Sequence, residues 1–407
     1  MNYRMPIERF AARLEEDFRA LADKYPGDNL RRLLESTTVA VFEYLGLEEG
    51  LSLQEKVLRV EGRPTISVDF AKDLLTMLLE RERVVEACRW LDTLPEDLSQ
   101  PLRTSFSIVV VTKDRGNSIS ETLSCLRNLV YPSSQMEIIV VDNGSADNTK
   151  VVVEEELAGA PCDVRIIYQP DGRICAARNA GIGVAKGDWI GFIDDDARCK
   201  SDWLLNYLLG SLSFPEAAAM GGPSRLPDHY LRPKWWNERC NLLSSCQEKH
   251  EKTTKTGFLQ YPFGLNMWFR REVFAEVGLF DSRLDASCRS MHDETELFYR
   301  IQRAGYDIVY VPSAVVTHCI SEDRMRYGNL IRRAFLVGQA DRVVEIIHPN
   351  QLRLGFSSFA GFFKALAAPI HETPHVTIPL LISRWAGYVC QLFFLRRSLI
   401  REEDRSR

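Results

Sequence analysis

The sequence predicts an α/β fold with a mostly parallel central sheet and flanking helices, preceded by a helical domain and followed by a helical extension. Between about residues 104 and 320, short β-branched runs alternate with helical segments, which is typical of a parallel sheet covered by helices. Before and after that region, apolar residues recur at helical spacing. We therefore expect a helical N-terminal domain at 1–100, the α/β domain at 101–320 and a helical extension at 321–407.

The composition indicates a folded protein with no affinity for nucleic acid. The chain has 407 residues, of which 45% are hydrophobic and 26% are charged, and these fractions are ordinary for globular domains. Its length predicts more than one domain. The formal net charge of −5 provides no overall basic field that would attract a polyanion, so any anion site must be local.

Several features predict a cytoplasmic protein. The ten cysteines are scattered without a C-x-x-C pair, as in a reducing compartment. Residues 1–10 lack the apolar core of a secretory signal. The most apolar stretch, 376–394, is interrupted by Pro379 and Arg384, so we expect a buried or interfacial helix there rather than a membrane span. Peripheral contact with the cytoplasmic face of a membrane stays open.

The elements can be placed in order along the chain. A linker rich in proline and polar residues at 94–101 follows the N-terminal helices. The expected strands are 106–112, 137–142, 164–168, 189–194 and 308–312. The expected helices are 118–130, 146–158, 175–185 and 294–304, with more helices from 322 onward.

Polar residues close three of the expected strands. Ligands of open α/β sheets bind at the carboxyl ends of the strands, so these residues are candidates for a site. Thr112 and Arg115 close the first strand and Asp142 closes the second. Three consecutive carboxylates, at 194–196, close the strand that begins near residue 189.

The run Asp194, Asp195 and Asp196 predicts a divalent cation. Adjacent carboxylates at the end of a buried strand oppose each other's ionisation unless a cation neutralises them. Side chains alternate along extended backbone, so Asp194 and Asp196 are expected on one side and Asp195 on the other. Two oxygens on one side, completed by waters and a diphosphate, suit Mg²⁺ or Mn²⁺. A solvated acidic turn is the alternative.

Asp142 admits two compatible interpretations. With Asn143, Gly144 and Ser145 it forms a strand-to-helix turn pattern in which Ser145 would cap the helix. Its carboxylate could also accept a hydrogen bond from an N–H of a nucleotide base.

Five segments, in this order, resemble glycosyltransferase family 2: 107–115, 139–145, 177–181, 192–197 and 277–281. The resemblance covers about residues 104–320. It implies a GT-A fold, a nucleotide-sugar donor, an Mn²⁺ or Mg²⁺ ion and inversion at the anomeric carbon. By position, it implies that Asp142 contacts the base, most often uracil, and that Arg178 helps to hold the nucleotide. It also implies that Asp194 faces the ribose or the metal and that Asp196 faces the metal.

The resemblance implies further residues of the active site. Residues 293–300 resemble the acidic segment that opens a helix and supplies the general base, which takes the proton of the attacking hydroxyl. The base falls on Glu294, but Asp293 is a rival because the family's usual order is Glu before Asp. His318 stands where the family often has a metal or diphosphate ligand. We assign the remaining donor-site contacts to Thr112, Arg115, Asp195, Asn266 and Trp268.

The predicted function is transfer of a sugar from a UDP-sugar to a hydroxyl of a glycan, lipid-linked or other acceptor, in polysaccharide or glycolipid assembly. The enzymatic alternative is a nucleotidyltransferase, although the segment after the first strand has only one glycine. A catalytically inactive scaffold is the other alternative. Arginines at 324, 326, 332 and 333 could meet an acceptor phosphate, a membrane surface or solvent. The N-terminal domain could mediate self-association, hold a partner or bind the acceptor. The pair Trp235 and Trp236 could stack on a sugar or pack in a core.

Overall fold

The computed structural model describes residues 104–129, 131, 133–170, 172–247, 253–257, 260–288, 291–349, 351 and 374–405. The helical N-terminal domain expected at 1–100 lies outside these residues. All statements below refer to the described part of the chain.

The central sheet has eight strands in the order β3-β2-β1-β4-β9-β6-β10-β8. The bounds are Asp163–Tyr168 (β3), Met136–Asp142 (β2), Phe106–Thr112 (β1), Trp189–Ile193 (β4), Asn266–Arg270 (β9), Ala217–Gly221 (β6), Asp307–Tyr310 (β10) and Thr254–Lys255 (β8). Strands β3, β2, β1 and β4 run parallel, as do β6 and β10. Strand β9 is antiparallel to both of its neighbours, so the sheet is mixed, though mostly parallel as expected.

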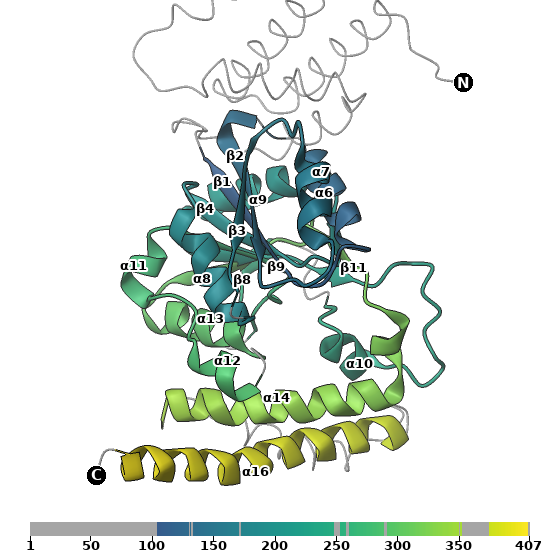
Figure 1. Ribbon diagram of the computed structural model, residues 1–407, viewed down its shortest axis with the longest axis vertical. Helices are drawn as coiled ribbons and strands as arrows, with labels where there is room; N and C mark the ends of the chain where they lie inside the picture. The colour runs from purple at the N-terminus through teal and green to yellow at the C-terminus, as the bar shows by residue number, and fades with distance from the viewer. Residues whose placement is uncertain are drawn as a thin grey trace, which may run out of the picture.

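Helices cover both faces of this sheet (Figure 1). The cluster on one face contains alternate residues of β1, such as Ile108 and Val110, with α6 (Ile119–Arg127), α7 (Thr149–Leu157) and α9 (Trp203–Ser213). The other cluster contains Val109, with α8 (Ile174–Val184), α11 (Val273–Val277) and α13 (Asp293–Arg303). Both faces of a parallel strand are buried, which explains the continuous apolar runs of the sequence.

A second, three-stranded sheet lies beside the end of β4. It has the order β5-β11-β7, with bounds Ala197–Cys199, Val316–His318 and Ser224–Arg225. Strand β5 follows the acidic run directly, and β11 pairs with it so that His318 lies opposite Ala197. This pairing brings residues more than a hundred positions apart to one point.

The C-terminal region contains two long helices, α14 (Tyr327–Ile347) and α16 (Pro374–Arg405), which lie side by side (Figure 1). They cross at backbone contact, because a Cβ added at Gly338 would lie 1.6 Å from the carbonyl oxygen of Arg384, and one at Gly387 would lie 1.9 Å from that of Phe335. Val376 and Leu380 of α16 pack with Leu330 of α14. No helix among the described residues has the length and hydrophobicity needed to cross a bilayer.

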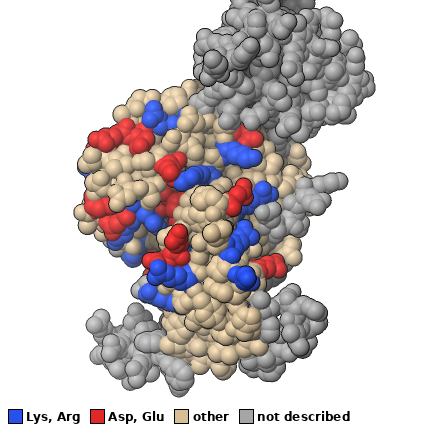
Figure 2. All heavy atoms as spheres, turned by 90° about the vertical axis from the view of Figure 1, so that its right-hand side faces the viewer, with Lys and Arg blue, Asp and Glu red and all other residues tan. Residues whose placement is uncertain are grey.

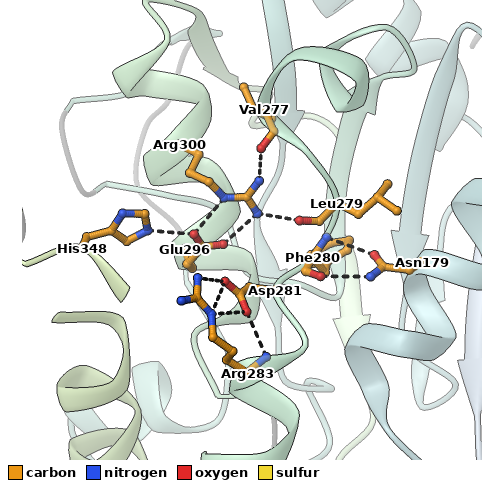
Figure 3. A network of polar contacts seen from close by, with 9 residues as sticks. All are labelled: Asn179, Val277, Leu279, Phe280, Asp281, Arg283, Glu296, Arg300 and His348. Atoms are coloured by element: carbon orange, nitrogen blue, oxygen red, sulfur yellow. Dashed lines mark hydrogen bonds and ion pairs between the residues drawn. The ribbon is translucent and has the colours of Figure 1, made fainter. Parts of the chain in front are cut away.

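Hydrogen bonds of Arg300 hold helix α13 against the rest of the domain (Figure 3). Its guanidinium donates to the carboxylate of Glu296 at 2.8 Å and to the carbonyl oxygens of Val277 and Leu279. His348, after the end of α14, contacts the same Glu296 at 2.8 Å. The network holds the first turn of α13, which carries the predicted general base, against both the 277–281 loop and the C-terminal helices.

Candidate active site

The acidic run forms a turn between β4 and β5. The backbone N–H of Ala197 donates to the carbonyl oxygen of Asp194 at 3.1 Å, which closes a β-turn with Asp195 and Asp196 at its centre. The expectation of extended backbone over these residues was therefore wrong, since β4 ends at Ile193. The turn nevertheless brings the carboxylates of Asp194 and Asp196 together and directs that of Asp195 elsewhere.

Asp194, Asp196 and His318 form a group that could hold a metal ion. Each offers one ligand atom, and these atoms lie within 4.8 Å of one another. Nδ1 of His318 lies 2.9 Å from the carbonyl oxygen of Ser244, which can only accept, so Nδ1 carries a hydrogen. In the neutral ring, Nε2 then presents a lone pair. Nε2 is buried, has no hydrogen-bond partner among the described residues and lies 3.3 Å from Asp196 Oδ1, so the donor set fits a divalent cation.

The charges around this group differ between its two carboxylates. Burial and the charge of Asp196 raise the pKa of Asp194. Burial opposes ionisation of Asp196 as well, but His318 in its protonated form, Arg324 and Arg115 outweigh it and lower the pKa of that carboxyl. Arg324 lies 3.4 Å and Arg115 lies 3.6 Å from Asp196 Oδ2. Asp196 therefore stays ionised, as a metal ligand must.

Asp195 has a separate set of partners. The hydroxyl of Thr112 donates to its carboxylate at 2.8 Å, and Nε of Arg115 lies 3.4 Å away. Burial raises the pKa of Asp195 to about 7. The structure thus brings Thr112, Arg115 and Asp195 together beside the candidate metal group, and Thr112 and Asp195 are hydrogen-bonded to each other.

Asp142 ends β2 and caps the following turn. Its Oδ1 accepts the backbone N–H of Ser145 at 2.8 Å. Ser145 does not cap the helix as expected, because α7 begins at Thr149 with Asn148 as N-cap; its hydroxyl instead accepts the backbone N–H of Asp114. The neighbouring Asn143 is buried, and its Oδ1 has no partner among the described residues. No sequence motif distinguished this polar atom.

Arg178 and Asp293 form an ion pair that is almost fully buried, with 10% and 2% of their side chains exposed. The guanidinium lies over the rings of Phe192 and Phe280, at 5.8 and 5.3 Å from their centroids. A Cβ at Gly264 would lie 2.9 Å from its NH2, so that glycine leaves room for it. Burial alone would lower the pKa of Arg178, but Asp293, Asp194 and Glu294 raise it above its usual value. Arg178 therefore lies between the acidic turn and helix α13.

The two candidate bases have different surroundings. Asp293 is engaged by Arg178, whereas Glu294 lines a cavity of about 330 Å³. Burial, followed by the charge and a hydrogen bond of Asp293, raises the pKa of Glu294 well above its usual value. His292 precedes them in the left-handed region, at φ 66°, and its Nε2 lies 3.0 Å from Asp341 of α14. The turn that presents Glu294 is thus anchored to the C-terminal helices.

The structure places two predicted contact residues away from this site. Asn266 is fully buried, accepts from Trp203 and Tyr207 and donates to the carbonyl oxygens of Pro223 and Ala314. Trp268 is also fully buried, with its ring 5.1 Å from those of Phe106 and Trp203. Both lie on β9, in the centre of the sheet. Hydrogen bonds use both amide atoms of Asn266, and aromatic packing surrounds the ring of Trp268, whose Nε1 has no partner among the described residues.

The four arginines at 324–333 do not form one basic face. Arg324 contacts Asp196, Arg326 pairs with Asp323 at 3.1 Å, and Arg333 donates to the hydroxyl of Ser245 at 3.1 Å, while Arg332 is exposed. Nothing in the sequence links Arg324 to a carboxylate 128 positions earlier.

The two adjacent tryptophans, Trp235 and Trp236, pack against the small core formed by α10 (Glu238–Leu243), α14 and α16. The ring of Trp235 lies 5.4 Å from that of Tyr327. Of the two interpretations of this pair, packing in a core is the one that the structure supports.

Comparisons with known proteins identify a family and several relatives. Residues 107–278 match the family described as Glycosyl transferase family 2. A glucosyl-dolichyl phosphate glucuronosyltransferase of Haloferax volcanii is 26% identical over 61% of this chain and 79% of its own length. A succinoglycan biosynthesis protein of Rhizobium meliloti is 28% identical over 55% of this chain and 70% of its own. A mannosyltransferase of Pyrobaculum calidifontis, solved with GDP-Man and Mn²⁺, is 19% identical and covers 81% of this chain and 86% of its own, with a TM-score of 0.45.

The family match begins in β1 and ends after α11, so it spans every strand of the central sheet except β10, together with the acidic turn between β4 and β5. The resemblance that the sequence motifs predicted is confirmed over this region. Residues 107–278 of this chain belong to glycosyl transferase family 2, and the protein is a glycosyltransferase.

Proposed function

We propose that the protein transfers a sugar, with inversion, from a UDP-sugar to an acceptor hydroxyl in polysaccharide or glycolipid assembly. The observation that carries this proposal is the convergence of Asp194, Asp196 and the unpartnered Nε2 of His318 at the carboxyl end of β4. This group would hold Mn²⁺ or Mg²⁺, which supplies positive charge to the diphosphate of the donor when bound.

The nucleotide would lie along the carboxyl ends of β1, β2 and β4, where Thr112, Asp142 and the acidic turn stand together. Asp142 uses one oxygen to cap its turn and has a second to accept from a base N–H. The buried Oδ1 of Asn143 lacks a partner, which supports a polar ligand at this edge. Arg115 faces the acidic turn and would help to neutralise the diphosphate. Arg178, engaged by Asp293, would position α13 rather than contact the nucleotide.

Glu294 would act as the general base. The acceptor oxygen forms a bond to the anomeric carbon as the bond from that carbon to the diphosphate oxygen breaks, the diphosphate leaves with the electron pair, and Glu294 takes the hydroxyl proton. Glu294 is favoured over Asp293 because it lines a cavity of about 330 Å³, whereas Asp293 is already neutralised by Arg178.

The test is a calorimetric titration of UDP with and without Mn²⁺, in the wild type and in Asp196→Asn, with Lys150→Ala, a change at an exposed residue of α7, as the control. We expect binding that needs Mn²⁺, that Asp196→Asn abolishes and that Lys150→Ala retains. If UDP binds to all three proteins equally with and without Mn²⁺, the proposed metal site is contradicted. If UDP, GDP and dTDP all fail to bind, the alternative of a catalytically inactive scaffold is favoured. If the protein releases diphosphate from a nucleoside triphosphate and a sugar phosphate, the alternative of a nucleotidyltransferase is favoured.

A further inference from the structure

A cavity of about 330 Å³ lies between the first turn of α13 and the C-terminal helices. Glu294 and Thr295 line it from α13, residues of α10 and the 261–263 loop line its sides, and α14 and α16 line the remainder. Its volume falls in the range of about 300–1,000 Å³ that is usual for small-molecule sites. Helices α14 and α16 lie outside the segment that matches the family, so the family match does not describe this wall of the cavity.

Most of the wall is apolar. It is formed by Leu242, Leu243, Phe263, Val337, Leu380 and Leu381. Buried contact with such side chains favours a hydrocarbon chain by about 25 cal/mol for each Å² removed from water. Figure 2 shows that the end of the molecule formed by α14 and α16 has few charged side chains on the face in view, whereas basic and acidic side chains alternate above it.

The same cavity contains two arginines that lack an acidic partner. Arg239 and Arg333 line it, and neither lies within ion-pair distance of a carboxylate among the described residues. Arg384 also lines it, but Asp341 binds that guanidinium at 2.7 and 2.8 Å. Burial, with a further effect of the neighbouring Arg324, lowers the pKa of Arg333 to about 10. Half-buried guanidinium groups without a counter-ion are costly, and an anion at this point would neutralise them.

We propose that this cavity binds the acceptor, and that the acceptor is a saccharide carried on the phosphate of an alkyl or isoprenoid chain. The hydrocarbon would contact the leucines of α10 and α16, the phosphate would face Arg239 and Arg333, and the hydroxyl to be glycosylated would face Glu294. This inference rests on the proposed function, because it assigns the acceptor of the same reaction. A free glycan would use neither the apolar wall nor the two arginines.

The test uses decyl phosphate below its micelle concentration as a probe, titrated calorimetrically into the full chain. Two controls separate the parts of the probe: inorganic phosphate has the anion without the alkyl chain, and decanol has the alkyl chain without the phosphate. We expect decyl phosphate to bind at least tenfold more tightly than either. Arg333→Gln and Arg239→Gln should each weaken it at least tenfold, since each removes a charge-assisted hydrogen bond. Arg332→Gln, which changes the adjacent exposed residue of α14, should bind within twofold of the wild type.

The same samples separate this inference from the proposed function. Binding of UDP with Mn²⁺ is measured in each variant, and its retention shows that the variant is folded. If UDP binds but decyl phosphate does not, or binds Arg333→Gln as well as the wild type, the acceptor assignment is overturned and the glycosyltransferase proposal stands. If decanol binds as tightly as decyl phosphate, the role of the phosphate is overturned. If decyl phosphate binds and no nucleotide does, the cavity is an amphipathic anion site and the proposed reaction fails.

Discussion

Arg178 and Asp293 form a buried ion pair that joins helix α8 to the first turn of helix α13. Asp293 directly precedes Glu294 in the chain, and Arg178 is close enough to Asp194 of the acidic turn for that carboxylate to raise its pKa. The ion pair therefore sets the position of the proposed base relative to the proposed metal ligands, and a change at either residue affects both folding and chemistry.

Replacement of Arg178 by Gln should destabilise the fold. It leaves the carboxylate of Asp293 buried without a counter-charge, and breaking a buried pair in this way costs about 3–5 kcal/mol. Urea denaturation of the two proteins measures the difference in the free energy of unfolding. The control is Lys150→Ala, which removes an exposed pair with Glu154 at 3.9 Å and should change that free energy by at most about 0.5 kcal/mol. A loss below about 1 kcal/mol in Arg178→Gln would contradict the buried-pair interpretation.

Metal affinity should depend on His318 through one ring nitrogen. His318→Ala and Asp196→Asn are each expected to weaken Mn²⁺ binding at least about 100-fold, more than the 10–100-fold typical of residues that only orient ligands. The measurement is a titration followed by the paramagnetic resonance of free Mn²⁺. Asp195→Asn is the control, because its carboxyl bonds to Thr112 and its pKa of about 7 leaves it partly protonated at neutral pH. Equal loss in all three variants would mean that the turn acts as a diffuse acidic patch.

The pH dependence of transfer should report Glu294. A base works in its deprotonated form, and the pKa of Glu294 is raised by burial and by Asp293, so activity should increase as the pH rises through a value well above 4.5. Glu294→Gln should lower kcat at least about 100-fold and retain UDP binding.

Asp293→Asn provides the matched test of this pH profile. It removes the negative charge and the hydrogen bond that raise the pKa of Glu294, so the acid limb of kcat/KM should move to lower pH. The same profile in the wild type and in Asp293→Asn would exclude Glu294 as the titrating base.

The crossing of α14 and α16 should tolerate no side chain at Gly338. Gly338→Ala places a methyl group against the carbonyl of Arg384 and should lower the free energy of unfolding by about 1–3 kcal/mol, the usual cost of overpacking. Gly328→Ala is the control on the same helix, because its Cβ would meet nothing within 4 Å, and it should leave stability unchanged or raise it by up to about 1 kcal/mol. Thermal denaturation measures the midpoint temperature of unfolding of both variants. Equal midpoints for Gly338→Ala and Gly328→Ala would contradict this prediction.

By itself, the sequence determined the alternation of strands and helices, the family and the acidic run at the end of β4. These are local properties: apolar runs of five to seven residues form β1, β2 and β4 within one residue of the predicted bounds, because burial on both faces leaves no other pattern. The tertiary structure decided which side chains meet. Strand pairing places His318 next to Asp196. Packing of the C-terminal segment places Arg324 next to the same carboxylate, and packing of α8 against α13 pairs Arg178 with Asp293. The tertiary structure also buries Asn266 and Trp268 in the core and forms the cavity beside Glu294. Such contacts join residues far apart in the chain, so their distances depend on packing and leave no periodic signal in the sequence.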